Sequence, residues 1–457
     1  MPAYTLTVRA DFVYLILIQK SKKVKIKQKN FRLFSKKIDN APQMVYNRNM
    51  EKFTIAIIGG GASGLFLAAD LHKNGNSPFK TVIFERGERV GRKLSATGNG
   101  QGNITNLAVA ETEYFSSTSQ DAARAQEIIC AYDNVSLTDF FSSLGVLLTA
   151  DDRGRVYPAS RQASSLTDAL RFYLAEKGAE IRTGALVTKL QKEGDYFRLT
   201  YEKEGSTHTC YAQTVVLCTG GKAAKNFGTD GTAYALAQAF GHTVTPLYPS
   251  LVQLKTNTEH IKTLKGIRVN DGVLTARAHG REYALQGDII FTDYGVSGDA
   301  VFRLSAFIAD KIPSGKVELF IDFLPNTDEE SILSLLQDKQ KTYPNMDKTE
   351  LLFGIVNNQI GRAVMRRADG DIRKAAKLIK SFSLTVTGSL GFDYAQVTKG
   401  GVPLAETDKS LQSRLIDGLY FAGEILDIDG QCGGFNLQWA YASARIVGAA
   451  ISAKMDK

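Results

Sequence analysis

The sequence predicts an α/β fold: a Rossmann-like dinucleotide-binding domain whose chain is interrupted by a β-rich insert and a small helical insert. Three observations predict it. A short apolar run, a glycine-rich turn and an Ala/Leu-rich stretch follow one another at 54–71. A similar order returns near the end of the chain, at 418–450. Between them, the pattern changes to short strands at 242–325 and to helices at 326–380.

The turn at 54–71 has the spacing of a nucleotide-phosphate site. Residues 54–58 resemble a buried parallel strand, and Gly59-x-Gly61-x-x-Gly64 follows. In this motif Gly59 makes the tight turn, Gly61 lets the backbone approach a pyrophosphate, and Gly64 lets the helix pack on the strand. The pyrophosphate then lies at the positive end of the helix dipole. We therefore predict a dinucleotide site, against the alternative of an ordinary glycine-rich turn.

The next strand and loop extend the same site. A strand at 81–84 ends in Glu85, about twenty positions past the glycines, where a carboxylate can accept the ribose hydroxyls. The segment 86–106 is rich in Gly, Asn and Thr, and carries Arg92 and Lys93. A structureless loop of this length is uncommon in a compact domain unless it is functional. We expect it to contact the nucleotide, although an exposed turn is the simpler alternative.

The segment up to residue 221 alternates helices and strands. Periodicity predicts one helix within 121–147, with Ile128, Ile129, Leu137, Phe140, Phe141 and Leu144 buried. A turn at 153–158 and a helix at about 162–177 follow. A meander of short strands at 180–210 then leads to a separate buried strand at 214–218, which ends in Thr219-Gly220-Gly221.

The changes of pattern set the domain boundaries. We assign 50–241 and 391–457 to the dinucleotide-binding domain, 242–325 and 381–390 to a β-barrel or sandwich insert, and 326–380 to a helical insert. Residues 338–380 hold ten Lys or Arg and five Asp or Glu. We interpret this excess as a solvated helical face in preference to a contact with a polyanion.

The C-terminal segment decides which dinucleotide is expected. A strand at 419–422 ends in Gly423-Glu424, a loop with Gly430, Gly433 and Gly434 follows, and a helix begins near Asn436. Glu424 can accept from ribityl hydroxyls, and the helix N-terminus can face the pyrimidine end of a flavin. Together with the N-terminal turn, this favours FAD over NAD as the tightly held cofactor.

Composition excludes several other classes of protein. The four cysteines (Cys130, Cys210, Cys218 and Cys432) have no CxxC or metal-ligand spacing, which predicts a reducing compartment, the cytoplasm, and no disulfide framework or metal site. None of the five histidines falls in the glycine-rich motifs, and no Ser/His/Asp set suggests hydrolysis. The longest apolar run of the first fifty residues, 12–18, is too short to cross a bilayer.

The basic N-terminal segment accounts for the net charge of +9. Residues 1–49 hold eleven Lys or Arg and two Asp or Glu, so the remainder of the chain is formally neutral. The segment is either a nucleic-acid- or membrane-binding arm, or an upstream extension from an overcalled start. We favour the extension and expect little order in it.

The chain from about 54 to 450 resembles the BaiN/YhiN-type NAD(P)/FAD-dependent oxidoreductases, also called aminoacetone-oxidase-family FAD-binding enzymes. Four stretches carry the resemblance: IGGGASG at 58–64, GRKLSATGNGQGNITN at 91–106, FTDYGVSGDA at 291–300 and GLYFAGEILDIDGQCGGFNLQWA at 418–440. The resemblance implies an FAD domain interrupted by a β-barrel domain and a helical domain. Members look like oxidases or reductases of small molecules, or like reductases that make dihydrouridine in ribosomal RNA.

This chain departs from the family at one loop. Where the family commonly has NGRCN, this sequence has Asn99-Gly100-Gln101-Gly102-Asn103. No role of that arginine or cysteine can therefore be transferred to it. Cys432 lies in the loop expected to face the flavin and is a weak candidate for a catalytic thiol; we favour a small loop residue.

The sequence leaves three functions open. The first is an FAD-dependent oxidoreductase that uses NAD(P)H as a transient reductant and passes a hydride from flavin N5 to an electron-poor acceptor, with uridine in ribosomal RNA as one acceptor. The second is an oxidase or reductase of a small amine, ketone or enone. The third is a non-enzymatic flavin-bound redox sensor. The general acid and the oligomeric state stay unassigned.

The candidate cofactor-binding residues are Gly59, Gly61, Ala62, Ser63, Gly64, Glu85, Arg86, Arg92, Lys93, Thr97, Gly98, Asn99, Asn103, Gly220, Gly423, Glu424, Gly433, Gly434, Asn436 and Leu437.

Overall fold

The computed structural model describes residues 51–73, 79–112 and 114–455. Residues from Glu51 onward form one compact unit. The expectation for residues 1–49 lies outside the described residues. Within the described part of the chain, no helix has the length and apolarity that a membrane span requires.

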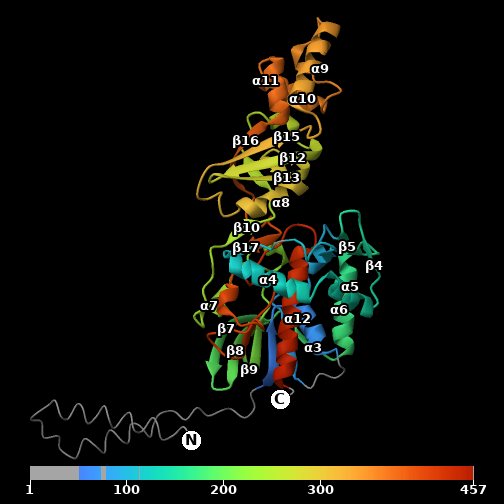
Figure 1. Cartoon of the computed structure of the whole chain (residues 1–457). Coiled ribbons are helices and arrows are strands. Elements are labelled where there is room, and N and C mark those ends of the chain that lie inside the picture. The colour runs from blue at the N-terminus through green and yellow to red at the C-terminus, as the bar shows by residue number, and fades with distance from the viewer. Residues whose placement is uncertain (1–50, 74–78, 113, 456–457) are drawn as a thin grey trace, which may run out of the picture. The chain divides into compact units, whose positions relative to one another are not determined.

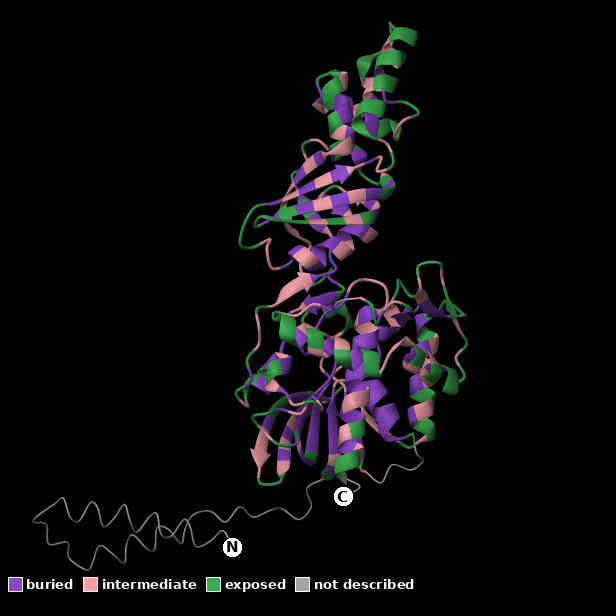
Figure 2. Cartoon of the chain, viewed as in Figure 1, coloured by how far each residue is buried: buried purple, intermediate pink, exposed green. Residues whose placement is uncertain are grey.

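A seven-stranded sheet lies at the centre of the dinucleotide-binding part of the structure (Figure 1). Its order is β6-β2-β1-β9-β8-β7, and β18 pairs with β9. The strands are β1 (Lys52–Ile58), β2 (Thr81–Phe84), β6 (Glu180–Arg182), β7 (Leu186–Glu193), β8 (Tyr196–Lys203), β9 (Ser206–Leu217) and β18 (Leu419–Phe421). The sheet is parallel from β6 through β9, and β7 and β8 are antiparallel. The parallel strands β1, β2 and β18 are apolar and mostly buried (Figure 2), whereas the edge strand β6 is half-buried.

Two helices from opposite ends of the described chain pack together on this sheet. They are α3 (Ala62–Leu71), which follows β1, and α12 (Phe435–Met455). The rings of Phe66 and Tyr441 meet edge-to-face with centroids 5.4 Å apart, and Arg445 pairs with the buried Asp70 at 3.0 Å. The pairing brings the two glycine-rich turns, which precede these helices, to the same region of the domain.

The inserted β-rich segment is a closed barrel, which confirms the barrel and excludes the sandwich. Its order is β11-β14-β13-β12-β15-β16. The strands are β11 (Leu254–Thr256), β12 (Arg268–Ala278), β13 (Arg281–Phe291), β14 (Gly295–Ser297), β15 (Val317–Asp322) and β16 (Phe382–Ser389). In β15, buried and half-buried residues alternate, as expected when one face of a strand points into a core.

The helices of the 326–380 segment share a core with the barrel. They are α9 (Glu329–Thr342), α10 (Asn358–Arg367) and α11 (Ile372–Lys380). Leu336 of α9 and Ile379 of α11 belong to the same buried cluster as Leu319 of the barrel strand β15. The boundaries between the three domains remain a prediction.

Short elements connect these parts. The strands β10 (Tyr248–Ser250) and β17 (Val397–Lys399) pair antiparallel where the chain enters and leaves the barrel. A three-stranded sheet is formed by β3 (Thr105–Asn106), β5 (Arg155–Pro158) and β4 (Leu148–Ala150). The remaining helices are α4 (Ser119–Ala131), α5 (Asn134–Ser143), α6 (Ala163–Glu176), α7 (Tyr234–Gln238) and α8 (Asp299–Ile308).

Three local predictions were wrong. The single helix expected within 121–147 is two helices, because Asp133 accepts a hydrogen bond from the backbone of Ser136 and starts α5. The expected buried residues are otherwise placed correctly, except that Phe140 and Leu144 are only half-buried. The turn expected at 153–158 is confined to its first two residues, and 155–158 form the strand β5, because their backbone pairs with β3 and β4.

The meander was also divided at the wrong places. The strand β6 joins β2 in parallel and does not belong to the meander. The expected break between 210 and 214 does not exist, because β9 pairs with β8 along its first half and with β1 along its second. The helix α8 was missed, since its ten residues lie inside a segment whose pattern is otherwise that of strands.

Candidate functional site

A cavity of about 810 Å³ lies between the two glycine-rich turns. It is lined by the turn after β1, the end of β2, the 86–103 segment, the 218–236 segment and the loop before α12. It also reaches β5 and the loop before β17. Its size is within the range of cofactor and small-molecule sites.

The N-terminal turn is open toward this cavity. Gly59 has φ +109°, and an added Cβ would lie 2.3 Å from the carbonyl oxygen of Cys218. An added Cβ on Gly64 would lie 2.0 Å from the carbonyl oxygen of Gly59, as expected for close packing of helix and strand. Gly61 differs from both, because a Cβ there would meet no atom within 4 Å. No side chain caps the N-terminus of α3, so its first backbone N–H groups are left for a ligand.

The carboxylate of Glu85 braces this turn. One oxygen accepts the backbone N–H of Gly60 at 2.9 Å, and the other accepts that of Gly87 at 2.6 Å. Each carboxylate oxygen has a second lone pair. Glu85 lines the cavity and retains acceptor capacity for hydroxyl groups.

The 86–106 segment is less irregular than expected. It contains a 3₁₀ turn at Leu94–Ala96 and ends in β3. Two of its cations are bound within the protein: Arg86 pairs with Asp230 at 2.9 Å, and Arg92 donates to the carbonyl of Asn226 at 2.7 Å. Arg86 and Arg92 therefore fix the cavity wall. To bind a phosphate, each would have to divide its hydrogen bonds between the phosphate and its present partner.

An ion pair joins the 86–106 segment to the end of β18 across the site. Lys93 Nζ lies 2.7 Å from Glu424 Oε2, and the other oxygen of Glu424 accepts the backbone N–H of Thr398 at 2.9 Å. Both charged side chains line the cavity. The carboxylate at the end of β18 is therefore held in place before any ligand is added.

The loop before α12 is fixed by backbone geometry. Gly433 and Gly434 have φ +116° and +103°. The carbonyl of Gly433 accepts from the amide of Asn106 at 3.4 Å, and Thr105 donates its hydroxyl to Gln438 at 2.6 Å. These contacts set the start of α12 against β3 at the cavity.

The predicted residues gather around one cavity, with two exceptions. All the candidate cofactor-binding residues line it except Gly64 and Gly423. Gly423 packs behind the wall, where a Cβ would lie 2.6 Å from the hydroxyl of Ser63. Asn103 and Asn436 line the cavity, but their amide groups bind backbone atoms of neighbouring loops.

The cysteine candidate lacks the properties of a nucleophile. Cys432 lines the cavity with its sulfur 3.8 Å from Gln396 Oε1. Burial raises the pKa of the Cys432 thiol to about 11, so it is protonated near neutral pH. This geometry favours a role for Cys432 as a small residue of the loop over a role as a catalytic thiol.

Sequence reasoning missed the wall formed by β5. Arg155, Tyr157 and Arg161 line the cavity. No motif marked them, and the segment was expected to be a turn. Only the presence of two arginines and a tyrosine within seven residues distinguishes it, and that pattern is common on exposed surfaces.

A buried carboxyl lies at the start of the loop before α12. Asp429 is fully buried, and Ser250 donates its hydroxyl to it at 3.0 Å. Its other oxygen has no hydrogen-bond partner among the described residues. Burial raises the pKa of Asp429 to about 7; Asp427 and Glu424 act in the same direction, and Lys399 opposes them.

Asp429 should therefore make stability depend on pH. Since its folded pKa of about 7 exceeds the ordinary value of 3.8, the folded state binds the proton more tightly, and stability falls as pH rises between these values. Asp429→Asn should remove most of this fall and gain about 4 kcal/mol at pH 8 relative to wild type. Urea unfolding at pH 5, 6.5 and 8 measures it, with the exposed Asp195→Asn as control. Equal pH slopes in wild type and Asp429→Asn would contradict the assignment.

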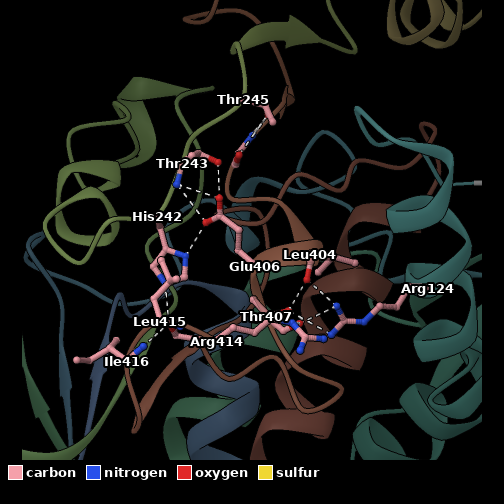
Figure 3. Close-up of polar contacts among 12 residues, drawn as sticks. Arg124, His242, Thr243, Thr245, Leu404, Glu406, Thr407, Arg414, Leu415 and Ile416 are labelled. Carbon is pink, nitrogen blue, oxygen red and sulfur yellow. Dashed lines mark hydrogen bonds and ion pairs between the residues drawn. The ribbon is translucent and has the colours of Figure 1, made fainter.

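The structure also brings together a serine, a histidine and a carboxylate, of which Figure 3 labels the histidine, His242, and the carboxylate, Glu406. His242 Nδ1 lies 2.7 Å from Glu406 Oε2, and His242 Nε2 lies 2.7 Å from Ser413 Oγ. The hydroxyl of Ser413 already accepts the backbone N–H groups of Leu415 and Ile416, at 3.0 and 3.1 Å. Its proton is therefore donated to His242 Nε2, and Nδ1–H is donated to Glu406.

This arrangement is structural. His242 and Ser413 are buried, and neither lines the cavity. Nearby, the guanidinium of Arg124 donates to the carbonyls of Leu404 and Thr407 (Figure 3) and to that of Asp408. Arg124 binds the 404–416 segment to α4, and His242 binds the same segment to the chain just before β10. The sequence could not show the contact between His242 and Glu406, because these residues are 164 positions apart.

Comparison with known proteins identifies the family. The sequence profile described as HI0933-like protein Rossmann domain matches residues 53–450. The chain belongs to this family. Membership in the HI0933-like family makes it an FAD-dependent oxidoreductase family enzyme, which confirms the resemblance and the fold class predicted from the sequence.

Three relatives of known activity are similar over most of their length. The chain is 34% identical over 412 residues to the 3-dehydro-bile acid delta(4,6)-reductase of Clostridium scindens, covering 87% of this chain and 98% of that protein. It is 28% identical to the ribosomal RNA dihydrouridine synthase of Haemophilus influenzae, with the same coverage. It is also 28% identical to that of Escherichia coli, covering 86% of this chain and 97% of that protein.

Proposed function

We propose that this HI0933-like protein is an FAD-dependent, NAD(P)H-linked reductase of a carbon–carbon double bond conjugated to a carbonyl group. The observation that carries the proposal is that both glycine-rich turns line the same cavity. A double bond next to a carbonyl is the feature that uridine shares with an unsaturated 3-oxo bile acid. Both kinds of molecule occur in the names of the relatives.

The residues present fit FAD. The uncapped N-terminus of α3 and the open space at Gly61 suit a pyrophosphate, whose charge the helix dipole stabilises. Glu85 would accept the ribose hydroxyls, and Glu424 would accept ribityl hydroxyls while Lys93 holds it in place. The N-terminus of α12 would face the pyrimidine end of the ring.

When bound, the flavin supplies reversible hydride transfer; the protein supplies position and exclusion of water. The loop of Gly433 and Gly434 and the wall formed by β5 enclose the part of the cavity beside the start of α12. An acceptor in this space would lie among Tyr157, Arg161 and Cys432. The wall formed by β5 therefore delimits the space in which the acceptor would lie.

Uridine in ribosomal RNA is the first candidate acceptor. The exposed Arg373, Lys374 and Lys377 of α11 make no ion pair among the described residues, so their charges are available to phosphates. Other cations of the 326–380 segment form ion pairs within the protein, such as Arg362 with Glu350 and Lys380 with Asp322. A small enone is the second candidate, favoured by the 34% identity to the bile acid reductase.

One experiment tests the proposal and separates the acceptors. The FAD-loaded protein is mixed without oxygen with NADH or NADPH, and then with protein-free ribosomal RNA or a 3-oxo-4-ene bile acid. We expect bleaching of the flavin by a nicotinamide and a product two daltons heavier from one acceptor. Flavin that no nicotinamide reduces, or that neither acceptor reoxidises, would contradict the proposal. RNA binding should weaken steeply with salt if RNA is the acceptor.

A further inference from the structure

The cavity wall formed by β5 contains a tyrosine with an unused hydroxyl. Tyr157 is 6% exposed and lines the cavity. Within the described ranges its hydroxyl neither donates nor accepts a hydrogen bond. Unlike the unpartnered hydroxyl of Tyr234, which is buried, that of Tyr157 is reached by solvent. A phenol that lines a ligand cavity without a protein partner is placed to bind what enters the cavity.

An arginine covers the ring of this tyrosine. The guanidinium carbon of Arg161 lies 4.1 Å from the centroid of the Tyr157 ring. Arg161 has φ +52°, a left-handed conformation that costs free energy in a residue with a side chain. Among the described residues its guanidinium makes no hydrogen bond or ion pair. Arg155 is the contrast: Asp151 binds it at 2.7 and 2.8 Å, and its guanidinium is 5.9 Å from the same ring.

These charges suit a phenol that gives up its proton. Burial raises the pKa of Tyr157 and keeps it protonated near neutral pH; Asp151 and Cys432 act in the same direction. Arg155 and Arg161 act in the opposite direction and stabilise the phenolate once it forms. The proton is thus retained until an acceptor basic enough to take it is bound.

We propose that Tyr157 is the proton donor of the acceptor reduction and that Arg161 is a positioning residue that holds its ring and stabilises its anion. The inference rests on the proposed function. Hydride addition to the β-carbon of the conjugated double bond leaves an enolate. The O–H bond of Tyr157 then breaks, a C–H bond forms at the α-carbon, and the O–H electron pair stays on the phenolate. Water returns the proton to Tyr157, and NAD(P)H supplies the next hydride to the flavin.

The first test separates the two halves of the reaction. In stopped-flow experiments with Tyr157→Phe, the rate of flavin bleaching by NAD(P)H should match wild type. Reoxidation by the acceptor that wild type reduces, ribosomal RNA or the 3-oxo-4-ene bile acid, should slow by about 100-fold or more. The control is Tyr343→Phe, a half-exposed tyrosine of the segment after α9 outside the cavity. Arg161→Gln should lower the turnover number more than it raises the KM, and Arg161→Lys should recover part of the loss.

The second test needs no turnover. 3-Fluorotyrosine is placed at position 157 and its ionisation is followed by ¹⁹F NMR in flavin-free protein. Arg161→Gln should raise the pKa of this label, because it removes the cation over the ring. The same label at Tyr343, which is 44% exposed and lies outside the cavity, should not respond.

The outcomes distinguish the two proposals. Wild-type protein that reduces neither acceptor overturns the proposed function and this inference with it. If wild type reduces an acceptor and Tyr157→Phe reoxidises at the wild-type rate, the function stands and the assignment of Tyr157 is wrong. An unchanged ¹⁹F titration in Arg161→Gln would overturn the role of Arg161.

Discussion

Gly61→Ala is expected to weaken FAD binding by about 100-fold or more, equivalent to about 3 kcal/mol, while the flavin-free protein keeps its fold. The reason is that an added Cβ meets no protein atom within 4 Å and points into space that the cavity offers to a ligand. The backbone of Gly61 is also in an ordinary extended region, with φ −79°, so alanine adds no strain. The cost to folding should stay within about 1 kcal/mol, the usual difference between glycine and alanine at an N-cap.

Fluorescence titration of flavin-free protein with FAD measures this effect, with urea unfolding as the companion. Gly61→Val should bind more weakly still, since its side chain fills more of the same space. Retained affinity in both variants would show that no phosphate approaches this turn.

Gly434→Ala is expected to do the reverse and destabilise the fold itself by about 4 kcal/mol or more. Its φ is +103°, and an added Cβ would lie 2.4 Å from the carbonyl carbon of Thr105. Thr105 belongs to β3, which fixes the start of α12, so the backbone cannot move without displacing both elements.

The adjacent Gly433 supplies a matched control. It has φ +116°, but the nearest atoms to an added Cβ are 3.7 Å away. Gly433→Ala therefore pays only for backbone strain, about 1–3 kcal/mol. Denaturant unfolding of both variants separates strain from overlap. Equal destabilisation of the two would show that the overlap at Gly434 is relieved.

Local signals in the sequence were sufficient for three strands of the parallel core, β1, β2 and β18. The strand at 81–84 was placed correctly, because a four-residue apolar run between polar residues has few alternatives. The break at Asp133 was missed, since the residues on both sides of it suit a helix and only the capping hydrogen bond from Ser136 separates them. The continuity of β9 was missed because its two halves pair with different strands, and each half resembles a strand of its own.

The cavity was predicted where motifs mark it. The turn at Gly59, Glu85 and the loop before α12 all follow from spacing. The contact between Lys93 and Glu424 did not, because 331 positions separate them and no pattern in either segment refers to the other. Tyr157 and Arg161 were missed for the same reason: only the pairing of β5 with β3 brings them to the cavity.

The two glycine-rich turns should together hold one FAD in this cavity. The most direct measurement is the flavin content of the purified protein, reconstituted with FAD and FMN in competition and then denatured to release what is bound. We expect FAD and not FMN, at one molecule per chain, and a visible flavin spectrum before denaturation. Protein that stays colourless after reconstitution, or that takes up FMN equally well, would contradict it.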